Sequence, residues 1–385
     1  MKQAMLRVLL LAALIPVLCG LLCLSASADE TDLEAVTMPD AYGDLEGILP
    51  PEVTELLPQG LFSRDAEEAL DATREMSEWS YLLQALLEAV GLRLHDAVGL
   101  LCTLLGLILI AAVLGKLKES LGGASGDIWG FCIRLALYTA IVLQTAGTVE
   151  LLQGFFSQLN ALMGGMIPVM GILYALGGNL GQAAVSGELT VVLLAVCEYV
   201  SATVTPPVCA VCLSFSLMDA VGLRLTLSHL CDQIKRWYVG LLGLVMFLLS
   251  LALSAQSVLA GRADTLGMKG IKYAVGNMIP VVGGAVAGSL GTVAAGVSLI
   301  RGVCGVSGII LIALLLIPVL VQLLLFRAVL RLAATVSALL GCDGETRLLG
   351  EMASLHGYLA AAASICSLTF VLSLALLIHT TSAIG

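Results

Sequence analysis

Charged side chains are scarce in this chain, and their scarcity decides its class. They make up 12% of 385 residues, whereas soluble domains carry about 25%. Hydrophobic residues reach 59% and the mean hydropathy is +1.03. This composition excludes an ordinary soluble protein and predicts an all-α, polytopic helical membrane protein, with the lipid bilayer as its main surroundings. No basic face is present, so no nucleic-acid partner is expected.

Catalytic and metal-binding motifs are also missing. The four histidines form no HExxH or paired-ligand spacing, and no phosphate-binding loop occurs between a strand and a helix. Cys209 and Cys212 have the spacing of a redox or metal pair, but no second pair or nearby histidine supports that use. We therefore predict that they pack as small residues. No catalytic residue, metal or cofactor is predicted, and the chain is not expected to be an enzyme.

The excess of negative charge belongs to one segment near the N-terminus. The net charge is −10, yet residues 29–80 alone hold fifteen acidic side chains against two basic ones. Residues 1–28 precede this segment and have the basic start, apolar middle and Ala-Ser-Ala end of a signal peptide. An uncleaved first helix is the alternative. In both cases the acidic segment is expected to be exported.

The exported segment divides into two parts. Residues 29–62 contain four prolines, many carboxylates and few aromatics, which predicts an acidic extended arm. Residues 63–96 carry apolar side chains at helical spacing, with Ser63 as the expected N-cap. This amphipathic helix would either lie on the bilayer surface or bind a partner.

The rest of the chain is apolar and divides into membrane segments. Residues 97–150 hold two runs, 97–115 and 129–149, each long enough to cross a ~30 Å core. Residues 151–260 and 261–385 are predicted to form two further membrane units. In all, roughly seven to nine membrane-embedded segments are predicted after the signal peptide. Loop charge cannot orient all of them, since no Lys or Arg lies between Glu150 and Asp219.

An eight-residue phrase occurs twice. Residues 164–171 read GGMIPVMG, and residues 276–283 read GNMIPVVG, 112 residues later. Pro206 and Pro318 are also 112 residues apart, each within an apolar run. We interpret 151–260 and 261–385 as tandem related units, a pattern typical of transporter folds. The alternative is chance recurrence within apolar sequence.

The phrase combines residues that disturb a helix. Proline removes a backbone donor, and glycine lowers helix propensity and permits close backbone contact. One interpretation is a discontinuous or re-entrant helix beside a pathway. The other is a kinked helix packed through small residues. The candidate residues are Gly164, Pro168 and Gly171 in the first copy, Gly276, Pro280 and Gly283 in the second, and Pro206 and Pro318.

Two carboxylates accompany the fourth apolar run. Glu188 and Glu198 have no basic neighbour in the sequence. Carboxylates within a membrane are costly and often mark an ion or substrate path. Ten residues of helix turn them about 80° apart, so they share a broad face. The alternative is that both are hydrated at the interface.

Several stretches resemble the stage III sporulation protein AE family of endospore-forming bacteria. They are residues 44–50 (DLEGILP), residues 272–284 (KYAVGNMIPVVGG), residues 303–310 (VCGVSGII) and the Pro318 run. The resemblance extends over nearly the whole chain and is strongest across residues 261–330.

The resemblance implies a multipass protein of the mother-cell membrane that surrounds the forespore. It would be a subunit of a secretion-like, feeding-tube channel needed for late forespore gene expression. Its partners would be the other proteins of the stage III sporulation A operon and, across the intermembrane space, stage II sporulation protein Q. The family offers no catalytic residues to transfer. The residues themselves leave a second hypothesis, an autonomous secondary transporter with broken-helix repeats.

Overall fold

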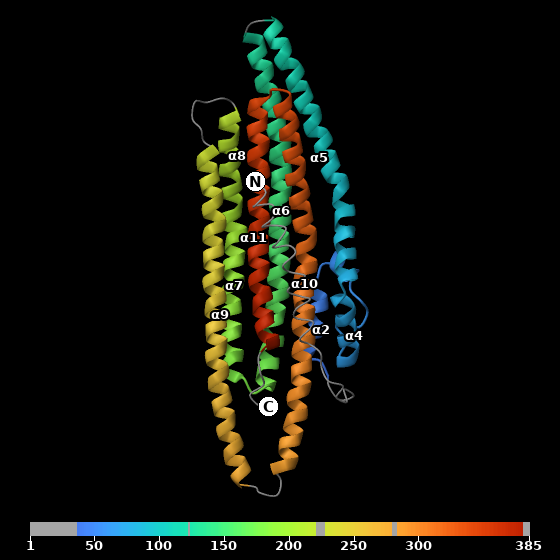
Figure 1. The fold of residues 1–385 in the computed structure, drawn as a ribbon, viewed down its shortest axis with the longest axis vertical. Helices are drawn as coiled ribbons and strands as arrows, with labels where there is room; N and C mark the ends of the chain where they lie inside the picture. The colour runs from blue at the N-terminus through green and yellow to red at the C-terminus, as the bar shows by residue number, and fades with distance from the viewer. Residues whose placement is uncertain (1–36, 122–123, 221–227, 279–282, 380–385) are drawn as a thin grey trace.

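In a computed structural model the chain forms an up-and-down bundle of very long helices (Figure 1). The structure describes residues 37–121, 124–220, 228–278 and 283–379. Its elements are α2 (Asp40–Gly43), η1 (Asp44–Ile48), α3 (Pro51–Thr54), α4 (Ala66–Ser77), α5 (Trp79–Leu121), α6 (Ala124–Leu176), α7 (Leu180–Tyr199), the π-helical turn η2 (Val200–Val204), α8 (Thr205–Ala220), α9 (Ser228–Met278), α10 (Gly283–Leu339) and α11 (Asp343–His379).

Six helical stretches of the described chain are long and apolar enough to cross a membrane. They are residues 79–116, 135–176, 180–218, 229–255, 296–339 and 343–379. The all-α polytopic fold is thus confirmed, and several of the predicted apolar runs are joined in single helices. The runs 129–149 and 155–176 belong to one helix, α6, because the polar residues between them do not stop a helix.

The core of the bundle is α10. Every residue from Val303 to Leu316 is buried, so this part of the helix is covered on all sides. A helix that is apolar all round is an interior helix. Its longest contact is with α11, where Gly308 admits the Leu374 side chain: a Cβ on Gly308 would lie 2.8 Å from Leu374 Cδ1.

The arm was expected to be extended, and this is wrong for residues 37–62. They form α2, η1 and α3, and Tyr42, Leu45 and Leu61 are buried in the same core as the long helices. Burial of these side chains stabilises the arm although its composition is acidic. The N-cap also differs: the Asp65 carboxylate, not Ser63, accepts from Glu67 N at 3.0 Å.

The amphipathic helix predicted over 63–96 is two helices. α4 ends at Ser77, and α5 begins at Trp79 and continues through the first predicted span to Leu121. The predicted signal peptide and residues 29–36 lie outside the described residues. The division into two related units stays a prediction.

Candidate functional site

A belt that is uncharged on α6, α9 and α10, and that carries Glu188 and Glu198 on α7, surrounds the middle of the bundle. Residues 302–326 of α10 carry no charged side chain, and buried Arg301 and Arg327 lie at the two ends of this stretch. At 1.5 Å per residue the stretch spans about 38 Å, enough to cross a ~30 Å hydrocarbon core. Residues 151–176 of α6 and 237–261 of α9 are uncharged as well. We term the two limits of the belt the Arg301 boundary and the Arg327 boundary.

Arg301 closes the end of α6. Its Nε and a terminal guanidinium nitrogen donate to Leu173 O at 3.2 and 2.8 Å, and its Cζ lies 5.6 Å from the Tyr174 ring centroid. Leu173 O already accepts from Gly177 N at 3.2 Å, and the Arg301 cation adds a charged donor to this carbonyl and complements the helix dipole. Gly177 leaves room for it, since a Cβ there would overlap the guanidinium. Arg301 therefore fixes the α6–α7 turn against α10.

Lys235 ties α9 to α11 near the Arg327 boundary. Its ammonium donates to Glu351 Oε2 at 2.6 Å and lies 3.0 Å from Asp232 Oδ1. The Lys235 side chain is wholly buried. Removing one member of such a buried pair leaves an uncompensated charge, so the contact fixes how α9 packs on α11.

His356 is a second polar link at the Arg327 boundary. Its Nε2 lies 3.4 Å from Thr148 Oγ1 of α6, and its Nδ1 lies 2.9 Å from Met352 O. The neighbouring Gly357 accommodates the Arg327 guanidinium, because a Cβ there would lie 2.6 Å from Arg327 Cζ. Buried polar groups thus join α6, α10 and α11 at one level.

The arm packs directly on the belt. Tyr42 donates its hydroxyl to Ser307 Oγ of α10 at 2.8 Å, and burial raises the Tyr42 pKa. Leu45 and Ile48 fill a notch at Gly165 of α6, where a Cβ would lie 2.6 Å from Leu45 Cδ2 and 2.8 Å from Ile48 Cδ1. Both Ser307 and Gly165 lie inside the uncharged stretches of their helices. The arm therefore occupies a position that lipid would otherwise take.

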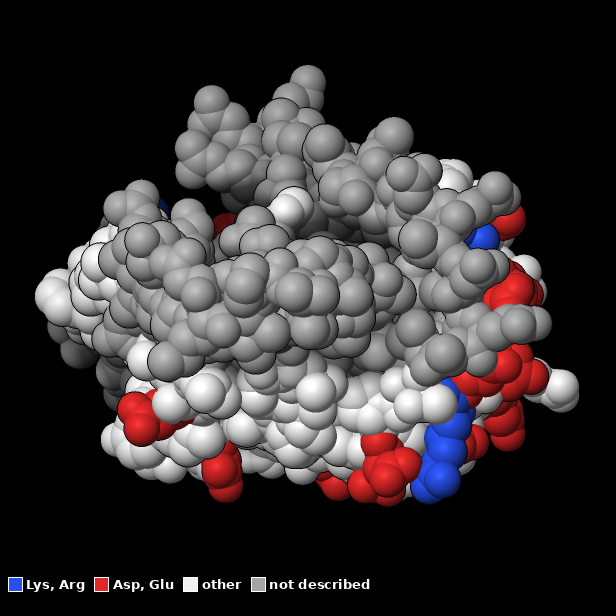
Figure 2. Space-filling view, turned by 90° about the horizontal axis from the view of Figure 1, so that it is seen from below, with Lys and Arg blue, Asp and Glu red and all other residues white. Residues whose placement is uncertain are grey.

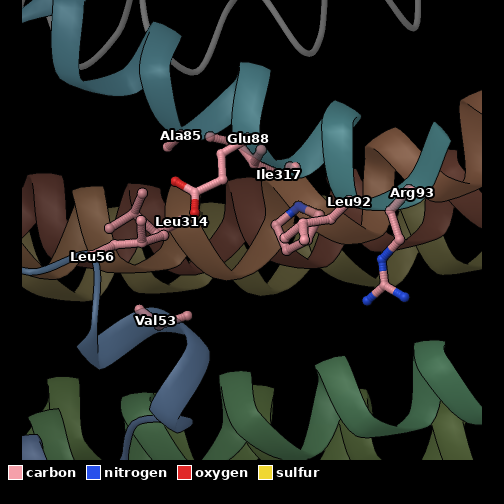
Figure 3. Close-up of a pocket in the computed structure, with 10 residues that line it drawn as sticks. Val53, Leu56, Ala85, Glu88, Leu92, Arg93, Leu314 and Ile317 are labelled. Carbon is pink, nitrogen blue, oxygen red and sulfur yellow. The ribbon is translucent and has the colours of Figure 1, made fainter. Parts of the chain in front are cut away.

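A groove of about 400 Å³ separates the arm from the bundle beside Pro318 (Figure 3). Its walls come from α3 and the segment after it, from α5 and from α10. Most of the lining is apolar, while the Glu88 carboxylate and the Arg93 guanidinium point in different directions from α5 (Figure 3). The lining residues are Val53, Leu56, Ala85, Glu88, Ala89, Leu92, Arg93, Leu314, Ile317 and Pro318.

The outer side of the arm, together with Arg64 and α4 that follow it, is charged. Arg64 and Asp40 form an exposed ion pair at 3.0 Å, and Glu67, Glu68 and Asp71 of α4 are exposed. In the end view, acidic side chains outnumber basic ones among the described residues (Figure 2). Charged side chains and irregular backbone are tolerated at membrane depth only against protein or water. This side of the belt is unsuited to lipid.

The two copies of the phrase lie in different settings. Gly164, Pro168 and Gly171 belong to α6, which continues unbroken to Leu176, so a discontinuous helix is wrong at this copy. Pro168 is exposed. The backbone hydrogen bond that a proline cannot donate is therefore lost at the surface of α6 and not in the core. In the second copy, Gly276 is in the last turn of α9 and Gly283 begins α10, whereas Pro280 lies outside the described residues.

The remaining candidates do not converge on one site. Pro206 follows the π-helical turn η2, where Thr205 N and Oγ1 both donate to Val200 O, so the helix is distorted but not interrupted. Pro318 lies inside α10 at the groove. Glu188 and Glu198 are exposed on the outside of α7. A charged side chain near the bilayer centre costs about 2.5–3.5 kcal/mol. An exposed carboxylate such as Glu198 is therefore unfavourable if it faces lipid.

Sequence reasoning overlooked the residues that hold the bundle together. Arg301 was detectable as a lone cation between two apolar runs, and Tyr42 as an aromatic in an acidic segment. The partnership of Lys235 with Glu351 had no local signal, since the two are 116 residues apart. Within the described chain, no three His, Cys, Asp or Glu side chains gather as a metal site would require.

Comparison with known proteins identifies the family. The family model for stage III sporulation protein AE matches residues 65–381. The chain belongs to the stage III sporulation protein AE family. Stage III sporulation protein AE of Bacillus subtilis (strain 168) is 24% identical over 214 residues, which are 55% of this chain and 53% of that protein. The chain thus spans about half the length of this curated relative. No solved structure matches.

Family membership gives the bundle its context. The matched region begins at the N-cap of α4 and ends beyond the last residue of α11, so it includes all six candidate spans. The resemblance stated from the sequence is therefore confirmed, and the chain is a stage III sporulation membrane protein. The folded part of the arm, residues 37–62, precedes the matched region.

Proposed function

We propose that the chain is the multipass subunit of a transenvelope, secretion-like channel complex between mother cell and forespore, needed for late forespore gene expression. It would lie in the mother-cell membrane with the residues after the signal peptide exported. Its partners would be the other proteins of the stage III sporulation A operon and, across the intermembrane space, stage II sporulation protein Q.

One observation carries the proposal beyond family membership: a charged arm packs on the uncharged belt. Tyr42 and Leu45 anchor it on α10 and α6, while Asp40 and Arg64 remain exposed on its outer side. Lipid does not tolerate such a surface, but a water-filled passage or another subunit does. The proposal assigns this side of the belt to the interior of the assembly. Glu188 and Glu198 face outward, so no described observation favours the autonomous transporter.

Purification of the tagged, full-length chain from sporulating cells of its own host tests the proposal. The other membrane proteins of the operon should co-purify in mild detergent, and deletion of the gene should abolish a late forespore transcription reporter. A chain that purifies alone, or a deletion that leaves the reporter unchanged, would contradict it. Non-sporulating cells expressing the same tagged chain provide the control.

A further inference from the structure

Three lysine or arginine side chains are buried among the described residues, and two of them have partners. Lys235 is bound by two carboxylates, and Arg301 donates to the Leu173 carbonyl. Arg327 is only 8% exposed, yet it forms neither a hydrogen bond nor an ion pair with any described residue, and its Nε is enclosed without an acceptor. A buried cation without a partner is strongly unfavourable. Arg327 is therefore suited to an anion that comes from outside this chain.

The neighbours of Arg327 strengthen its attraction for an anion. Arg331 is half-buried one turn farther along α10, about 6 Å away along the axis, and acts electrostatically on Arg327. Two cations at this spacing repel each other unless an anion lies between them. Tyr358 of α11 is half-buried within the same electrostatic range, and its hydroxyl is a further donor.

The guanidinium of Arg327 is held in a fixed place. It lies against the backbone of α11 at Gly357, where a Cβ would be 2.6 Å from Arg327 Cζ. A positioned guanidinium presents parallel N–H donors, which match the oxygens of a phosphate or a carboxylate. Position and charge together make a site for an oxyanion.

The depth of the site matches the headgroup layer of a bilayer. The uncharged stretch 302–326 of α10 has its middle at residue 314, and Arg327 is 13 residues beyond it, about 20 Å along the helix. The hydrocarbon core ends about 15 Å from the bilayer centre, and the headgroups extend to about 20–22 Å. Leu324 and Leu325 are half-buried one turn or less nearer the centre, where acyl chains lie.

We propose that Arg327 and Arg331 bind the phosphate of an anionic phospholipid at the bilayer interface. The phosphate neutralises both cations, and the acyl chains cover Leu324 and Leu325. Basic pockets between transmembrane helices bind anionic headgroups in this way. A free phosphate ion has the same charge but makes no use of the apolar surface beside the site. The inference goes beyond the proposed function and holds whether or not the chain works in a channel complex.

Equilibrium binding of radiolabelled phosphatidylglycerol to the detergent-solubilised, full-length chain tests the proposal. Phosphatidylcholine, whose headgroup has no net charge, should bind at least about tenfold more weakly. Arg327→Gln should lower the affinity for phosphatidylglycerol about tenfold or more, and Arg331→Gln about fivefold or less. Arg327→Lys should also lower it, because lysine keeps the charge but loses the parallel donors. Arg236→Gln is the matched control: this exposed cation of α9 follows Lys235, and its loss should change the affinity less than about twofold.

Two further measurements decide the source of the anion. Inorganic phosphate at the concentration of the lipid should not displace it. A photoreactive residue at exposed Ala328, in the full-length chain in sporulating cells, should form an adduct with a lipid. Equal binding of the two lipids, an affinity unchanged by Arg327→Gln or Arg327→Lys, displacement by inorganic phosphate, or an adduct with a protein in place of a lipid would overturn the proposal.

Discussion

Two sides of the belt are covered with opposite chemistry: α9 packs on α7, α8 and α11, whereas the arm packs on α6 and α10. On the α9 side, Leu244, Phe247 and Leu248 face outward. On the arm side, the outer layer carries Asp40 and Arg64. Hydropathy therefore tells which helices belong in a membrane, but not what each face of them contacts. What each face contacts is decided by tertiary packing. Different interactions attach the α9 side and the arm side to the bundle.

Removing the Lys235 ammonium should have the largest effect, because it holds the α9 side. Lys235→Met leaves the Glu351 carboxylate, which is 17% exposed, without its partner, and we expect a loss of about 3 kcal/mol in the free energy of unfolding. Thermal unfolding of the detergent-solubilised chain measures this. The double variant Lys235→Met with Glu351→Leu should recover much of the loss. Equal losses in the single and double variants would show that the pair contributes nothing specific.

A methyl group at Gly165 should dislodge the arm while the α9 side stays in place. Gly165→Ala sets a Cβ against Leu45 and Ile48, at a cost of about 1–3 kcal/mol to arm docking. Tryptic cleavage after Arg64 should then become faster. Gly164→Ala is the matched control, since nothing lies within 4 Å of its Cβ. Equal cleavage rates in the two variants would show that the contact of Leu45 and Ile48 with Gly165 does not hold the arm.

Deleting the Tyr42 hydroxyl should loosen the same contact more gently. Tyr42→Phe removes the hydrogen bond to Ser307, and we expect about 1 kcal/mol of weaker docking in the proteolysis assay. Ser307→Ala should have a similar effect. The two changes together should cost little more than one alone, because they break one bond. Fully additive losses would mean that the bond does not contribute to docking.

Truncating a lipid-facing side chain should have the smallest effect. Leu248 is 53% exposed on α9, so Leu248→Ala should change the free energy of unfolding by no more than about 0.5 kcal/mol. Thermal unfolding of Leu248→Ala is measured in parallel with that of Lys235→Met, so that the two losses can be compared. A loss comparable to that of Lys235→Met would place Leu248 in a protein contact and remove the contrast between the two sides.

The sequence predicted the helical class and the membrane character well, since both depend on composition summed over long stretches. Helix ends were less predictable. The polar residues around Glu150 suggested a boundary, yet α6 continues because a single charged residue costs a helix little. At Pro206 the missing donor is absorbed by one π-helical turn rather than by a break.

The arm and the charged links were not predictable from local pattern. An acidic, proline-containing composition favours an extended chain, but Tyr42 and Leu45 find partners on α10 and α6 that lie more than a hundred residues away. The partner of Lys235 is equally remote. Glu198 is exposed on α7, and a sequence alone cannot distinguish an outward carboxylate from an inward one; its role in a pathway stays a prediction.

Reaction with a membrane-impermeant maleimide tests most directly whether the arm side of the belt faces water. Asp44→Cys, beside Leu45 on the arm, and Leu251→Cys, in the middle of the α9 row, are compared in reconstituted vesicles, with labelling of the unsubstituted chain subtracted. A thiol in lipid neither ionises nor meets the reagent. We expect rapid labelling at position 44 and none at position 251 until detergent is added. Protection of both positions, or equal labelling of both, would contradict the account.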